Sequence, residues 1–355
     1  MTSSKITCKL FKLTGINSLD DVKKNILKKS FTDPLVVTKR DAKLISGLSD
    51  DEKNFYFTWG EISEPNELKL QTTDETDEDE NEKKKEIYVE YLIATANIEY
   101  PKRRKRDSSG NILPKTERVN YTQIMTYFLA FNNSVHLIIC SSNDAHQERV
   151  RKLVGTSFIA NSDKDYEIPS DLFNWLFFRY IENNGSLGDR LNLMNISGFI
   201  GNTADEHNIF KGISDQTSEL IITKAFISNG EILRTITARL RTEDIDIVFA
   251  IDYESNTQIY VNQSEKLKLL EAEDSDTFFI IYLYSHLIPK LKSLYNETSE
   301  QFLSNEKKQF SEKIGLEVIK SIINKNSLSL EDVSRLFNSP SDLRDTDQKA
   351  RIIIG

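Results

Sequence analysis

Five consecutive cations, Lys102 to Arg106, are the residues of this sequence best suited to a defined chemistry, which is the binding of phosphate groups. Lysine and arginine contact nucleic-acid phosphates through charge and need no particular base sequence. Residues 102–118 hold seven cations against two carboxylates, a local charge of +5. The sequence therefore predicts a nucleic-acid-binding site made of Lys102, Arg103, Arg104, Lys105, Arg106, Lys115 and Arg118.

The same run of cations has two other interpretations. It is typical of a solvated loop tip that nearby carboxylates neutralise, and basic runs also serve as nuclear-localisation signals. One source of carboxylates is residues 74–86, where eight acidic side chains and three lysines give a local charge of −5. A further hypothesis follows: this acidic segment competes with nucleic acid for the cations, as an intramolecular decoy.

Carboxylates suggest a second chemistry, the binding of a divalent metal ion through oxygen ligands. Asp33, Asp41 and Lys43 match the residue types of a metal-dependent nuclease, in which the metal activates water beside the scissile phosphate. Their spacing is short for that motif, so a nuclease is an alternative function only. A later acidic set alternates with apolar residues, which the solubility of a half-buried strand explains without a metal. Its members are Asp244, Asp246, Asp252 and Glu254.

Nucleophilic catalysis would need a cysteine paired with a base. Cys140 is close in sequence to His146 and could share a strand face with His136, but it ends an apolar run and is predicted to lie in the core. Cys140 and Cys8 are both expected to be free thiols. Because the sequence has no glycine-rich phosphate loop and no nucleophile elbow, we expect a binding protein without a cofactor rather than an enzyme.

The composition limits the class of protein. A chain of 355 residues with a net charge of −9 is unlike a protein that coats nucleic acid through a generally basic surface. The acidic and basic residues are concentrated in separate segments, however, so a local basic site is compatible with the net negative charge. The longest apolar stretch, residues 278–288, is too short to span a membrane, and the first residues lack the pattern of a secretion signal. We therefore expect a cytoplasmic protein with no membrane partner.

The elements that must position the basic residues are strands. Alternating or aromatic runs predict strands over residues 6–13, 55–59, 87–100, 122–131 and 135–140. The basic segment, residues 101–118, is then a hairpin loop between two strands. The acidic segment, residues 64–86, is poor in aliphatic side chains, which predicts a flexible loop.

Two helices are predicted in the same part of the chain. Ser18 is a suitable N-cap for a helix over residues 19–30, and a second helix is expected over residues 144–154. Cations near the end of the second helix interact favourably with the negative end of its dipole, which explains them without a binding role. The alternative is that they contribute to a basic binding surface. These cations are Arg149, Arg151 and Lys152.

The later part of the chain is more regular. An aromatic-rich helix is expected over residues 172–181, with its aromatics in the core, and a strand over residues 190–200. Residues 218–228 fit a helix or a buried strand. Residues 231–261 predict an antiparallel meander, which includes a half-buried strand with one solvent-exposed face. From residue 276 the pattern is helical. A stripe at four-residue spacing suits packing on a sheet or a partner: Phe310, Ile314, Val318 and Ile322.

These patterns predict an α+β protein with two domains, both built on mainly antiparallel sheets with flanking helices. The first domain would comprise residues 1–160 and carry the acidic and basic loops, and the second would comprise residues 161–355 and end in amphipathic helices. The expected function is binding of nucleic acid, of a protein partner through the C-terminal helices, or of both. Such a chain suits a subunit of a larger assembly, for example a bacterial antiviral defence complex. The alternative is an interaction scaffold that does not bind nucleic acid.

Overall fold

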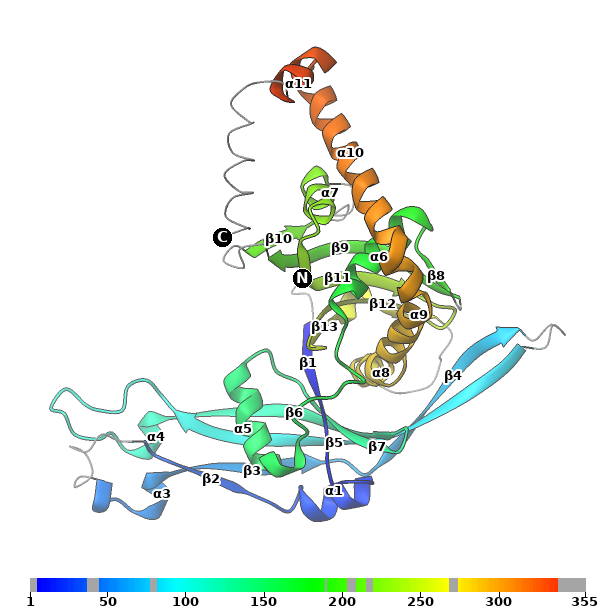
Figure 1. Ribbon diagram of the computed structural model, residues 1–355. Helices are drawn as coiled ribbons and strands as arrows, with labels where there is room; N and C mark the ends of the chain where they lie inside the picture. The colour runs from blue at the N-terminus through cyan, green and yellow to red at the C-terminus, as the bar shows by residue number, and fades with distance from the viewer. Residues whose placement is uncertain are drawn as a thin grey trace, which may run out of the picture.

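The computed structural model describes residues 5–36, 45–76, 82–188, 190–202, 209–214, 220–267 and 274–337. These residues form one antiparallel sheet of 14 strands with helices packed on it, which confirms the predicted α+β class (Figure 1). The strands are β1 (Lys5–Lys12), β2 (Phe31–Pro34), β3 (Asn54–Ile62), β4 (Asn66–Thr76), β5 (Glu82–Pro101), β6 (Val119–Phe131), β7 (Ser134–Ile139), β8 (Ser186–Gly188), β9 (Leu191–Asn202), β10 (Ile209–Ile213), β11 (Ile232–Arg241), β12 (Ile245–Asp252), β13 (Thr257–Tyr260) and β14 (Glu265–Lys266). The helices are α1 (Leu19–Asn25), α3 (Asp50–Lys53), α4 (Lys115–Arg118), α5 (Asp144–Val154), α6 (Ser170–Glu182), α7 (Ile221–Ser228), α8 (Ser275–Tyr282), α9 (Ile288–Gln301), α10 (Lys307–Lys325) and α11 (Leu330–Phe337).

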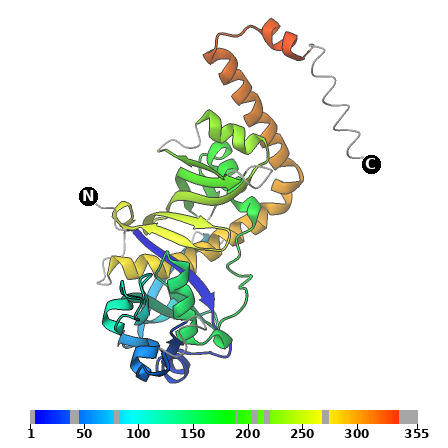
Figure 2. The same ribbon diagram turned by 90° about the vertical axis from the view of Figure 1, so that its left-hand side faces the viewer.

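Strand β1 joins the two parts of the sheet. Its first half, residues 5–8, pairs with β13, and its second half, residues 9–12, pairs with β7. The strand order is β10-β9-β11-β12-β13-β1-β7-β6-β5-β3-β2, with β4, β8 and β14 attached to β5, β9 and β12. Strand pairing therefore crosses position 160, where the sequence predicted the first domain to end. Strand β1 can be followed between the two parts of the sheet in Figures 1 and 2.

Local sequence signals explain several helix starts. The Ser18 hydroxyl accepts the backbone N–H of Asp21 at 3.1 Å, which confirms the predicted N-cap of α1. Asn143 caps α5 in the same way, through the backbone N–H of Ala145 at 2.9 Å. Of the two alternatives left open for residues 218–228, the helix is the one observed, as α7.

The acidic segment is not a flexible loop over its described length, and this prediction was wrong. Strand β4 pairs with the first part of β5 to form a two-stranded arm, in which Leu68 lies opposite Val89 and Leu70 opposite Ile87. Leu70 and Val89 are buried. Residues 64–86 are acidic on average, so their composition did not indicate a strand. The alternating leucines nevertheless give β4 an apolar face that packs against the protein. Residues 77–81 lie outside the described residues.

The meander of β11, β12 and β13 is observed as predicted, but β12 has less of a wet face than its alternation suggested. Asp246 and Val248 are buried, as are the alternating apolar residues Ile245, Ile247 and Phe249. The carboxylate of Asp246 accepts two hydrogen bonds from the guanidinium of Arg239 on β11, at 2.7 and 2.9 Å. A cross-strand partner thus allows this carboxylate to be buried.

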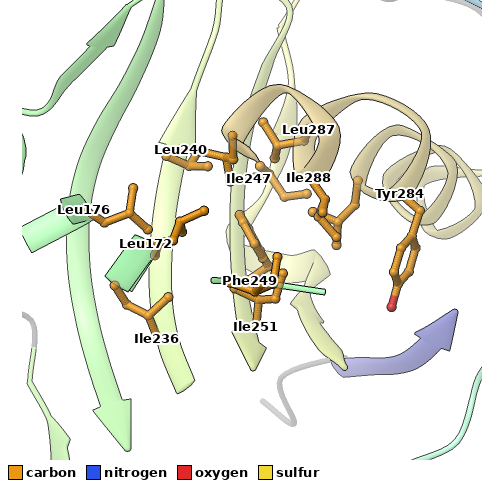
Figure 3. Close-up of a cluster of buried hydrophobic side chains, with 14 of the residues drawn as sticks. Leu172, Leu176, Ile236, Leu240, Ile247, Phe249, Ile251, Tyr284, Leu287 and Ile288 are labelled. Carbon is orange, nitrogen blue, oxygen red and sulfur yellow. The ribbon is translucent and has the colours of Figure 1, made fainter. Parts of the chain in front are cut away.

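Helices α6 and α9 cover one face of the C-terminal strands (Figure 3). Leu172 and Leu176 of α6 and Ile288 of α9 pack with alternate residues of β11 and β12, among them Ile236 and Phe249. Aromatics predicted to be core residues are buried at Phe173, Trp175 and Phe177, while Phe178 and Tyr180 are partly buried against the same core.

Helices α8, α9 and α10 follow one another through two π-helical turns, Leu283–Leu287 and Phe302–Glu306. In Figure 2 the far end of α10 projects away from the sheet. No helix within the described ranges combines the length and the apolar character needed to cross a lipid bilayer.

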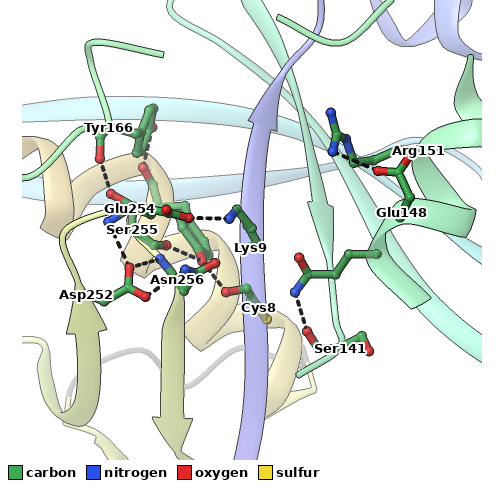
Figure 4. A network of polar contacts seen from close by, with 12 residues as sticks. Cys8, Lys9, Ser141, Glu148, Arg151, Tyr166, Asp252, Glu254, Ser255 and Asn256 are labelled. Carbon is green, nitrogen blue, oxygen red and sulfur yellow. Dashed lines mark hydrogen bonds and ion pairs between the residues drawn. The ribbon is translucent and has the colours of Figure 1, made fainter. Parts of the chain in front are cut away.

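A polar network, buried in part, lies where the two parts of the sheet meet (Figure 4). Lys9 of β1 forms an ion pair of 2.7 Å with Glu254, and the Ser255 hydroxyl donates to the backbone carbonyl of Tyr166. The fully buried hydroxyl of Tyr284 lies 2.8 Å from the hydroxyl of Thr257 and donates to the Cys8 carbonyl at 3.0 Å. This hydroxyl therefore ties the helical layer to β1 and β13.

Replacing Tyr284 with phenylalanine is expected to lower the free energy of unfolding by about 1–2 kcal/mol, because buried polar groups of Cys8 and Thr257 lose a partner. Burial raises the pKa of Tyr284 well above its ordinary value of 10.0. This hydroxyl therefore contributes stability that is complete below about pH 10 and is lost as the pH rises further. Urea unfolding at about pH 7 and about pH 11 should show a smaller alkaline loss for Tyr284→Phe than for the parent. Equal losses in both proteins would contradict this assignment.

Candidate nucleic-acid interface

The basic loop connects β5 to β6, which are adjacent antiparallel strands with Pro101 opposite Val119. Its predicted place between two strands is therefore confirmed. The loop extends from one end of the long β5–β6 pair, at the left of Figure 1. A loop in this position presents its side chains beyond the end of the sheet.

Hydrogen bonds order the loop. The Asp107 carboxylate accepts the backbone N–H groups of Ser109 and Asn111 at 2.9 and 2.8 Å, and these bonds with the Asn111 side chain lower the pKa of Asp107. Gly110 has a φ of +85°, which favours glycine at this turn. The Arg106 guanidinium donates to the Gly110 carbonyl. Asp107 and Arg106 therefore shape the turn itself.

The other four cations of the run are available to a ligand. Arg103 and Arg104 are exposed, and Lys102 and Lys105 are partly exposed. Arg104 donates through Nε to the Arg106 carbonyl at 3.2 Å, which leaves its terminal nitrogens unused by that bond. Among the residues that the structure describes, no carboxylate forms an ion pair with any of these four.

Lys115 and Arg118 were predicted to belong to the nucleic-acid-binding site, but the structure shows them as buried residues with structural ion pairs. Both lie on α4 and are 7% and 0% exposed. Lys115 pairs with Glu99 at 2.8 Å and with Asp51 at 3.2 Å, and Arg118 pairs with Glu52 at 2.8 Å. Their charges are neutralised in the protein because α3 supplies carboxylates from far away in the sequence, so they are not available to phosphates.

Helix α5 adds cations beside the base of the loop. The guanidinium carbon of Arg149 lies 4.5 Å from the ring centre of Tyr100, the residue before Pro101, and Nζ of Lys152 lies 6.0 Å from the ring of Phe31. Within the described ranges neither cation has a carboxylate partner. Aromatic rings hold these cations by cation–π attraction without removing their charge. A supporting place in a basic surface therefore stays a prediction for Arg149 and Lys152, and the sequence did not reveal their aromatic partners.

Two other groups on α5 are less suited to anion binding. Arg151 forms an ion pair with Glu148 at 2.9 Å, which neutralises it (Figure 4). His146 lies 5.4 Å from Tyr100, and burial together with the nearby charge of Arg149 lowers its pKa below the ordinary 6.5. His146 is therefore neutral at pH 7, and the charge of this surface comes from Arg149 and Lys152.

The acidic segment lies at the far end of β5 from the basic loop. Strand β5 has 20 residues between Glu82 and Pro101. An extended strand rises roughly 3.3 Å per residue, so its ends are on the order of 60 Å apart. Figure 1 shows the β4–β5 arm and the basic loop on opposite sides of the molecule. For the described part of the acidic segment, this distance contradicts the decoy hypothesis.

The remaining candidate sites are not assembled within the described ranges. Asp33 lies in β2, whereas Asp41 and Lys43 fall outside the described residues. No group of three or more potential metal ligands is found in the described part of the chain. Cys140 and His146, considered above as a nucleophile and its base, each contact a different residue. The Cys140 sulfur lies 3.4 Å from the Cys8 sulfur, and the His146 ring lies beside Tyr100.

No family model matches the chain, and the comparison with curated proteins also gives no match. The basic loop and α5 are therefore the features that bear on function.

Proposed function

We propose that this protein binds nucleic acid through its phosphate groups, as a non-enzymatic subunit of a larger cytoplasmic assembly. The observation that carries this proposal is the absence of ion pairs at Lys102, Arg103, Arg104 and Lys105 among the described residues, beside a loop turn that is itself ordered. Cations that remain unneutralised on an ordered loop favour an anionic ligand.

Helix α5 supports the same proposal. Arg149 packs on Tyr100, one residue before the loop begins, so its charge extends the cationic surface from the loop onto the helix. Phosphate contacts position a protein on nucleic acid but do not read its sequence. We therefore expect binding with little sequence preference and a strong dependence on salt.

Binding of labelled single-stranded and double-stranded DNA and RNA across a salt series tests the proposal. Each phosphate contact contributes a slope of roughly −0.7 to −0.9 in a plot of log K against log salt concentration. With four to six contacts, the expected slope is about −3 to −5. The absence of binding to every probe at low salt would overturn the proposed function.

A second candidate function, self-association through α10, is favoured by the exposed apolar residues of this helix. Three of the four residues in the predicted stripe are buried inside the protein, namely Phe310, Ile314 and Val318. The fourth, Ile322, is 43% exposed. A different pair projects outward: Leu316 is 68% exposed and Ile319 is 50% exposed. Apolar side chains that recur on one helix face in this way suit packing against a second helix.

Replacing Leu316 and Ile319 together with glutamate is expected to weaken self-association at least tenfold, because two charges would enter an apolar interface. Sedimentation velocity over a range of protein concentrations measures the effect. Leu303→Glu is a matched control, because Leu303 is similarly exposed at 46% but lies in the turn before α10. A parent protein that stays monomeric at every concentration would contradict this second function.

A further inference from the structure

Cys8 and Cys140 form a close pair of free thiols where β1 changes its pairing partner. Their sulfur atoms are 3.4 Å apart, although 132 positions separate the residues in sequence. Cys8 is the last β1 residue opposite β13, and Lys9 is the first opposite β7. Cys8 is fully buried, while Cys140 is partly exposed. The pair therefore combines a fully buried cysteine with a partly exposed one.

The backbone places the two residues in a geometry that accepts a disulfide. Lys9 lies opposite Ile139 in the antiparallel β1–β7 pair, so Cys8 lies opposite Cys140. The N–H of Cys140 donates to Met125 on β6, and the carbonyl of Cys8 accepts from Tyr284. They therefore form a non-hydrogen-bonded cross-strand pair, for which the Cα separation is typically about 4.5 Å. That separation falls within the range of about 4.4–6.8 Å found for disulfides.

We propose that Cys8 and Cys140 form a redox-sensitive site, at which a hydroperoxide converts the two thiols into an intramolecular disulfide. This inference is independent of nucleic-acid binding. The hydrogen bond to Cys140 and burial both raise the pKa of Cys8, so Cys8 remains a protonated thiol and Cys140 reacts first.

The reaction has two steps. Cys140 gives up its thiol proton as its sulfur attacks one peroxide oxygen, and the O–O bond breaks. The attacked oxygen stays on sulfur as a sulfenic acid, while the other oxygen takes up the released proton and leaves as an alcohol, or as water from hydrogen peroxide. Cys8 then loses its proton and attacks the Cys140 sulfur, which forms the S–S bond, breaks the S–O bond and releases water. In total, two thiols are oxidised and one peroxide is reduced.

Peptide mapping under non-reducing conditions, after treatment of the reduced full-length protein with hydrogen peroxide, tests the proposal. The expected product is a peptide pair linked through Cys8 and Cys140, which a dithiol reductant separates. In Cys8→Ser the reaction should stop at a Cys140 sulfenic acid that dimedone traps, and in Cys140→Ser the buried Cys8 should not react. Two unmodified thiols in the treated parent, or disulfides only between separate chains, would overturn the proposal.

A second measurement keeps the test informative if a serine variant folds poorly. Because the new bond would close a loop of more than a hundred residues in the unfolded chain, the oxidised parent should melt at a higher temperature than the reduced parent, by about several degrees. Addition of reductant should reverse this shift. A melting temperature that falls on oxidation would show that the strands do not accept the bond, and would also overturn the proposal.

Discussion

Replacing Lys102, Arg103, Arg104 and Lys105 with serine is expected to lower the affinity for nucleic acid at least tenfold at moderate salt. The variant removes up to four phosphate contacts, so the slope of log K against log salt should also become shallower by about 3. Arg106 is retained because its guanidinium donates to the Gly110 carbonyl within the turn. Fluorescence anisotropy with one oligonucleotide at several salt concentrations measures both quantities.

A control with the same change in net charge is available on the C-terminal helices. Lys308, Lys320, Lys325 and Arg335 are exposed and lie on α10 and α11. Serine at these four positions should leave the affinity within about twofold of the parent, because distant surface charges are screened beyond roughly 10 Å. Equal losses in the two variants would mean that binding follows net charge and not the basic loop.

Replacing Glu52 with alanine is expected to lower the free energy of unfolding by about 3 kcal/mol, because Arg118 would keep its charge in a buried site without its carboxylate. Glu52 has several partners. Its carboxylate contacts the Arg118 guanidinium and the backbone N–H of Lys115, both at 2.8 Å, and its carbonyl also accepts from Arg118. Urea unfolding measures the loss.

Two further variants separate the ion pair from a general effect of mutation. Glu117→Ala removes an exposed carboxylate from the same short helix as Arg118 and should change stability by less than about 0.5 kcal/mol. Adding Arg118→Met to Glu52→Ala should recover part of the loss, because the unpaired buried charge is then removed. A loss in Glu52→Ala no larger than that in Glu117→Ala would contradict the assigned role of this pair.

The strands of the fold could be predicted because their patterns are local. The alternation of residues 245–251 and the aromatic run of residues 55–59 both correspond to observed strands, and the position of the basic loop follows from the strands on either side. The division of β1 between β13 and β7 could not be predicted in this way, since it depends on which distant strands pair with it.

The surroundings of the candidate cations could be predicted only in part, because they also depend on distant residues. Residue types identify cations, but they do not show which carboxylates approach them. Lys115 and Arg118 look like the other cations in the sequence, yet Asp51 and Glu52, more than 60 residues earlier, bury and neutralise them. Arg149 is the opposite case, because its contact with Tyr100 brings it beside the loop although the chain separates them.

Hydrogen–deuterium exchange of the full chain, with and without a saturating oligonucleotide, tests the location of the proposed site most directly. Backbone amides of residues 101–114 and of α5 should exchange more slowly in the complex, because the bound phosphates restrict the loop and the helix beside it. The β4–β5 arm and strands β8 to β14 should be unchanged. Slower exchange confined to strands β8 to β14, with an unchanged basic loop in a protein that binds the oligonucleotide, would contradict the account.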